Sequence, residues 1–103
     1  MILALLSIEP PTVAADSEMI RARFRRGDRE VWDRFVRDEH GRIFNLHQRL
    51  IGDREAAADL TQDTFAEAWR SAGSYSGNAP PRAWLYGVAA NVNRNWLRRQ
   101  GQR

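Results

Sequence analysis

The residues with the clearest chemical potential lie at the end of the chain, in the segment 81–103. This segment carries five Arg and no acidic residue, whereas residues 1–80 carry 11 Arg against 13 Asp and Glu. Arg neutralises phosphates, and interleaved aromatic side chains such as Trp84 and Trp96 can stack on unpaired bases. The segment is therefore a candidate nucleic-acid surface, although basic amphipathic helices also bind membranes and protein partners.

A second charged pattern lies between residues 55 and 67. Glu55, Asp59, Asp63 and Glu67 follow one another at intervals of four, so a helix places the four carboxylates on one side, where they repel one another. Such a face is either simply solvated or a docking strip for a basic partner. Helical acidic ladders without His or loop ligands rarely hold a cation, and we expect no metal site here.

Catalytic chemistry has little support in this sequence. There is no Cys, and the two His, His40 and His47, form no set with zinc-site spacing. The chain also has no glycine-rich phosphate loop and no serine nucleophile motif. We therefore expect neither an enzyme nor a cofactor.

The charged segments need elements to position them, and the apolar spacing predicts helices. A short helix is expected after an N-cap at Asp16 or Ser17, with Met19, Ile20 and Phe24 as its apolar side and Gly27 after its end. The next helix starts after Asp28 and continues to Gly52, with a break or kink expected at His40-Gly41.

Two further helices complete the expected fold, an all-α single small bundle of about four helices. One runs from Arg54 to Arg70 after a cap at Asp53. The last begins at Pro81, which suits a first helical turn, and ends around residues 98–101. Its apolar stripe comprises Leu85, Val88, Ala89, Val92 and Trp96, and the side chains expected to fall away from the stripe are Arg82, Tyr86, Asn93 and Arg94.

The first 15 residues are expected to form an N-terminal extension to a domain over residues 16–99. The opening MILALLSI is far shorter than the roughly 20 residues needed to cross a bilayer. It also lacks the basic start and cleavage site of a secretory signal. We therefore expect no membrane insertion and a cytoplasmic protein, in line with the absence of Cys.

Two stretches resemble a known family. The first, GD…AADLTQDTF…AW over residues 52–69, is similar to the GD…AEDLTQETF…AW stretch of sigma-70 family factors of the extracytoplasmic-function (ECF) group. The second, AWLYGVAANV…LRR over residues 83–99, resembles their AWLYRIARN…D.LRR stretch. Both occur in the family's order, separated by a short Ser/Gly/Pro loop. The resemblance implies the region 2 fold, with residues 100–103 as the start of a linker to an absent region 4 domain.

The resemblance implies two partners, which are core RNA polymerase and promoter DNA. The helix carrying DLTQD would bind the clamp coiled coil of the large polymerase subunit through Asp59, Gln62 and Asp63. The loop and the last helix would bind the non-template strand of the minus-ten element and melt the duplex. The implied DNA-binding residues are Tyr75, Ser76, Gly77, Asn78, Arg82, Tyr86, Asn91, Arg94 and Arg98. Trp84 shares spacing with Val88 and Val92 and is expected in the core.

Three positions depart from the family pattern. Ala58 stands where an acidic residue is usual, Ala90 replaces the Arg of the ARN triplet, and Asn95 replaces an Asp. These changes put the DNA preference in doubt. They keep open the alternative of a sigma-like interaction module, bound by a possible anti-sigma factor, without DNA-opening activity. A membrane-surface helix protein is the third and least supported hypothesis.

Overall fold

The computed structural model describes residues 18–101, and the chain in this range is built from helices. Residues 18–25, here the first helical segment, precede α2 (Arg29–Ile51) and α3 (Arg54–Ser71). A short 3-10 turn (Ala72–Ser74) and a loop lead to α4 (Pro81–Gly101). No strand occurs among these residues, and the expectation of an all-α bundle of about four helices is confirmed. Because α4 continues to Gly101, residues 100 and 101 are helical.

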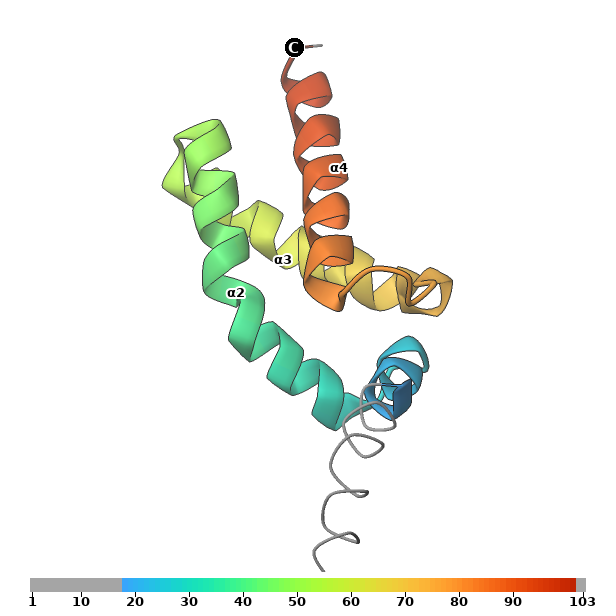
Figure 1. Ribbon diagram of the computed structural model, residues 1–103. Coiled ribbons are helices and arrows are strands. Elements are labelled where there is room, and N and C mark those ends of the chain that lie inside the picture. The colour runs from blue at the N-terminus through green and yellow to red at the C-terminus, as the bar shows by residue number, and fades with distance from the viewer. Residues whose placement is uncertain (1–17, 102–103) are drawn as a thin grey trace, which may run out of the picture.

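Helix α3 is the central element of the bundle. It packs against both α2 and α4, and Figure 1 shows it crossing behind these two helices. The first helical segment lies near the start of α2, below the loop that leads into α4 (Figure 1). The loop is therefore within reach of a segment that is far away in sequence.

The helix boundaries follow the predicted cap residues. Asp28 accepts a hydrogen bond from the backbone N–H of Val31, and Asp53 accepts from those of Glu55 and Ala56. Gly52 has φ of +79° after the end of α2, a left-handed conformation that glycine adopts without steric cost. These local signals are strong enough to be read from the sequence because they depend on only a few neighbouring atoms.

An aromatic cluster holds the first helical segment in place. Phe24 is 1% exposed, and its ring stacks on that of Trp32 with centroids 4.5 Å apart. The Trp32 indole also donates a hydrogen bond to the Phe24 carbonyl oxygen over 2.8 Å. Met19 and Ile20 are exposed, so our assignment of these two residues to the buried side is wrong, and of the three predicted apolar residues Phe24 is the buried one. The expected caps at Asp16 and Ser17 lie outside the described residues.

The expected break at His40-Gly41 is also wrong. Helix α2 runs without interruption from Arg29 to Ile51, although it changes direction near its middle (Figure 1). One helical Gly costs only about 1 kcal/mol relative to Ala. Glu39 and Ile43, on either side of His40-Gly41, are both buried, and their packing outweighs that local cost.

A buried polar cluster joins α2, α3 and α4. The His47 side chain is fully buried, with Nε2 at 2.9 Å from Thr64 Oγ1 and Nδ1 at 3.4 Å from Asn93 Oδ1. Burial lowers the pKa of His47, and the contact with Asn93 opposes this shift only in part. Asn93 was expected to face away from the apolar stripe, but it is 7% exposed. Asn93 therefore lies on the buried side of α4, where its side-chain oxygen is a polar partner for the buried His47 ring.

Candidate nucleic-acid and protein-binding surfaces

Tyr75 anchors the loop between the 3-10 turn and α4. Its ring is 2% exposed and packs edge-on against Phe24, with centroids 5.4 Å apart. Its hydroxyl donates a hydrogen bond to the carbonyl oxygen of Ala79. Trp84, also expected in the core, is partly buried against the same cluster. Tyr75 was expected to contact DNA, but its ring faces are covered by protein, so in this structure it supports the loop.

The tip of the loop is a small, preformed turn. Gly77 has φ of +85°, which a residue with a side chain adopts only with strain. The backbone N–H of Asn78 donates to Ser76 Oγ over 3.2 Å. The side chains of Ser76 and Asn78 are exposed. The turn therefore offers short polar groups to solvent on a backbone that is already ordered.

Arg82 lies at the start of α4, where it forms an ion pair. Its Nε lies 2.9 Å from both carboxylate oxygens of Glu39 in α2. The Glu39 side chain is buried, whereas that of Arg82 is half exposed. Tyr86, one turn further along, is 39% exposed and borders a hollow with Phe35 and Pro81. The main contact of Arg82 is thus with Glu39 inside the protein, and only part of its guanidinium is available to a ligand.

The remaining predicted DNA-binding residues follow the exposed surface of α4. Asn91, Arg94 and Arg98 are all exposed. Arg94 donates to Asn91 Oδ1 over 3.3 Å, and Arg98 donates to Asn95 Oδ1. Because Asn95 is a neutral acceptor, Arg98 keeps a charge that an Asp at this position would partly neutralise.

The residues predicted to bind polymerase share the exposed side of α3. Asp59, Gln62 and Asp63 are exposed, while Leu60 and Thr61 between them are buried. Among the described residues neither Asp59 nor Asp63 has a cationic partner within 4.0 Å. Glu67, the last of the four aligned carboxylates, forms an ion pair with Arg70 instead.

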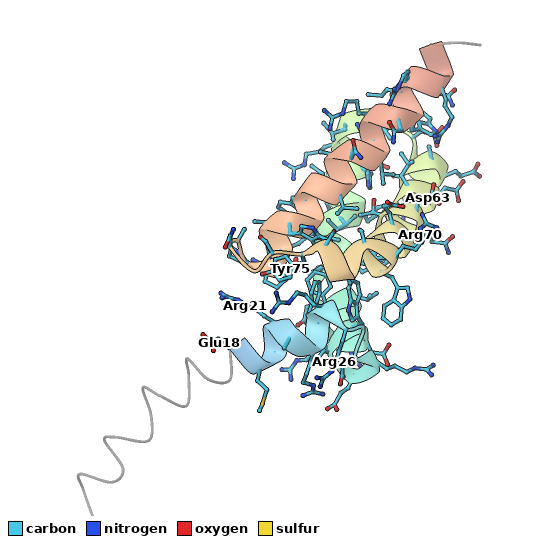
Figure 2. All side chains as sticks on the ribbon, turned by 90° about the vertical axis from the view of Figure 1, so that its right-hand side faces the viewer. Glu18, Arg21, Arg26, Asp63, Arg70 and Tyr75 are labelled. Carbon is cyan, nitrogen blue, oxygen red and sulfur yellow. The ribbon has the colours of Figure 1, made fainter. Side chains whose placement is uncertain are left out.

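The acidic side of α3 and the loop occupy different parts of the molecule. Figure 2 shows Asp63 and Arg70 along α3, with Tyr75 beyond the C-terminal end of that helix. A polar groove between α3 and α4 borders Asp63, lined also by Asn91, Asn95 and Arg99. The loop therefore lies apart from the acidic side of α3, whereas Asn91 on α4 borders the same groove as Asp63.

Sequence reasoning missed Glu39 and Asn93. Glu39 lies four residues after Phe35 and four before Ile43, which is a core position of α2. A carboxylate at such a position predicts a buried ion pair, because charged side chains are rarely buried without a partner. The partner cation then stabilises the fold and is less available to a ligand. The sequence could therefore have shown that Glu39 needs a cationic partner. That this partner is Arg82 becomes clear only from the fold.

Two other site types find no support among residues 18–101. No group of three or more His, Cys, Asp or Glu is arranged there to hold a metal ion. Within the same range, every helix is too short or too polar to cross a membrane.

Comparison with known families gives a match over two thirds of the chain. The profile described as Sigma-70 region 2 matches residues 35–103. The RNA polymerase sigma-H factor of Pseudomonas aeruginosa is 32% identical over 92 residues, covering 89% of this chain and 47% of that protein. The ECF RNA polymerase sigma factor SigE of Mycolicibacterium smegmatis is 35% identical over 71 residues, covering 69% of this chain and 27% of that protein. The chain thus spans about half or less of these relatives.

A solved structure has the same fold. It is the NMR structure of an engineered region 2 of sigmaE in complex with GTAAAA. The TM-score is 0.72 at 26% sequence identity, and the match covers 84% of this chain and 90% of the other. The neighbour was therefore solved with a nucleic-acid sequence bound.

We expect Arg82 and Arg94 to differ sharply in their importance for stability. Arg82→Gln leaves the buried Glu39 carboxylate without its cation, which should lower the free energy of unfolding by about 1–3 kcal/mol. Arg94→Gln removes only an exposed contact with Asn91, and its effect should stay within about 0.5 kcal/mol. Urea denaturation followed by far-UV circular dichroism measures both.

The double variant Glu39→Gln/Arg82→Gln is the control for this comparison. It should recover part of the loss, because no buried charge is then left unpaired. Equal effects of the two single substitutions would contradict the structural role of Arg82.

Proposed function

Because this chain belongs to the sigma-70 region 2 family, we propose that it acts in transcription initiation by docking on core RNA polymerase and by recognising and melting the minus-ten promoter element. It would bind the non-template strand, without enzymatic activity of its own and in the cytoplasm. The observation that carries the proposal is the exposed polar turn at Ser76–Asn78, which the buried Tyr75 holds in place before α4, the helix that also exposes Arg94 and Arg98. The DNA-bound state of the structural neighbour adds support.

In this proposal the turn reads an unstacked base. Ser76 and Asn78 offer hydroxyl and amide groups that both donate and accept hydrogen bonds. Extruding a base costs a few kcal/mol, which contacts to the base and its backbone must offset. Because the turn is already ordered, binding does not also have to order the loop.

Exposed Arg side chains of α4 supply the backbone contacts. Arg94 and Arg98 are four residues apart, about 6 Å along the helix, which is close to the spacing of successive phosphates in an extended strand. Their side-chain partners are the neutral amides of Asn91 and Asn95, so both charges remain available for phosphates. Asn91 and Tyr86 extend the same surface.

The acidic residues of α3 form the polymerase-docking surface. Asp59, Gln62 and Asp63 would contact basic side chains on the clamp coiled coil of the large subunit. The opposite side of α3 is buried through Ala57, Leu60 and Thr64, which fixes the orientation of the exposed carboxylates. Complementary charge of this kind favours fast and specific association.

The second candidate function is an interaction module that is bound by an anti-sigma factor and does not open DNA. One specific observation favours it, the ion pair that ties Arg82 to the buried Glu39. Ala90 also removes a cation that the family pattern places on this helix. Both features lower the positive charge that α4 offers to DNA.

The two candidates are separated by a selection experiment. A single-strand library randomised across the minus-ten element is incubated with the chain and core polymerase, and bound strands are sequenced. We expect enrichment of one motif, followed by tight, sequence-dependent binding of that strand in a fluorescence-anisotropy titration. Absence of any enriched motif would refute strand recognition and favour the interaction module.

For docking, we expect Asp63→Arg to abolish association with core polymerase in a pull-down without unfolding the domain. The new Arg would face the basic side chains of the clamp, so that repulsion replaces attraction. Asp59→Arg should act in the same way. Asp33→Arg, the same charge change at an exposed site on α2, serves as control and should retain binding. Retained association of the Asp63 and Asp59 variants would refute the assignment of this surface.

A further inference from the structure

Arg21, in the first helical segment, lies against the tip of the loop. A Cβ placed on Gly77 would meet Arg21 Cδ at 3.8 Å, and no other heavy atom beyond the chain neighbours within 4 Å. Figure 2 shows the Arg21 side chain between the first helical segment and the loop that carries Tyr75. We infer that Arg21 is a further strand-binding residue, which contacts a phosphate of the strand held at the Ser76–Asn78 turn. The inference rests on the proposed function.

The position of Arg21 is fixed by its own segment. Phe24, three residues later, is inserted into the aromatic cluster and bound by Trp32. Arg23 binds Asp28 with Nε and Nη2, each at 3.1 Å from a carboxylate oxygen. Two residues that closely follow Arg21 are therefore held, which fixes the backbone of the segment from which the Arg21 side chain extends.

The charge of Arg21 is available to a ligand. Among the described residues it has no carboxylate within 4.0 Å, whereas Arg23 is paired with Asp28 and Glu30. Arg82, the other cation close to the start of α4, is paired with Glu39. Arg21 is thus a cation beside the turn that no acidic side chain of the described range neutralises.

Gly77 forms the turn and brings it next to Arg21. Its φ of +85° favours glycine, and Arg21 Cδ lies 3.8 Å from the position that a Cβ would take. The aliphatic stem of Arg21 therefore approaches the turn at Gly77. A strand whose base is bound by Ser76 and Asn78 must carry its phosphates past the same edge, where Arg can bind two oxygens at once.

The test uses the strand enriched in the selection described above and four forms of the 103-residue chain. Arg21→Gln removes the charge and keeps most of the stem, and Arg21→Lys keeps the charge. Arg26→Gln is the matched control, because Arg26 is exposed and lies away from the loop (Figure 2). Affinity is measured by fluorescence anisotropy over a range of salt concentrations, and circular dichroism verifies that each variant is folded.

The expected result follows from counterion release, which contributes about 0.7 to the salt slope per phosphate contact on a single strand. Arg21→Gln should bind about fivefold more weakly than the parent at about 0.1 M salt, with a slope smaller by about 0.7. Arg21→Lys should stay close to the parent, and Arg26→Gln should match it.

Other outcomes overturn the inference in distinguishable ways. If the parent binds its strand and Arg21→Gln binds equally well, Arg21 is not a contact and the proposed function stands. An equal loss in Arg21→Gln and Arg26→Gln indicates a general charge effect. A loss of affinity at an unchanged salt slope indicates that Arg21 only supports the loop. A parent that selects no strand overturns the proposed function and this inference together.

Discussion

The ring of Phe24, inserted among those of its aromatic neighbours, joins three parts of this fold. Trp32 from α2, Tyr75 from the loop and Trp84 from α4 all pack against it. Aromatic pairs in these geometries contribute beyond the area that they bury. The same contact fixes the first helical segment and one end of the loop, so the proposed strand-binding residues of both are placed relative to each other.

Polar contacts then decide which charges are available for binding. The buried carboxylate of Glu39 neutralises Arg82, and Asp28 does the same for Arg23. Asn91 and Asn95 hold Arg94 and Arg98 without neutralising them. Net charge alone could not show this difference. The basic segment 81–103 thus contains one structural cation, Arg82, and several exposed ones, and we propose that Arg21 adds a further cation from outside that segment.

The sequence predicts local features of this fold well and long-range ones poorly. The caps at Asp28 and Asp53 are correct because they depend on adjacent residues. The break at His40-Gly41 is wrong because packing of α2 overrides the propensity of one glycine. Tyr75 was predicted to bind DNA because it lies in a polar loop, and only the packing of Phe24 and Trp84 against it shows that its ring is covered. The proximity of Arg21 and Gly77, 56 positions apart in the sequence, has no local signal.

We propose that one scaffold carries both a strand-binding loop and an acidic docking surface on α3. Titration of the isotope-labelled chain with its minus-ten strand, followed by NMR chemical shifts, is the direct test. We expect large shift changes for the amides of residues 76–78 and for the side chains of Arg21, Arg94 and Arg98, with Asp59, Gln62 and Asp63 unchanged. Changes centred on α3, or spread evenly over the basic side chains with the turn unaffected, would contradict it.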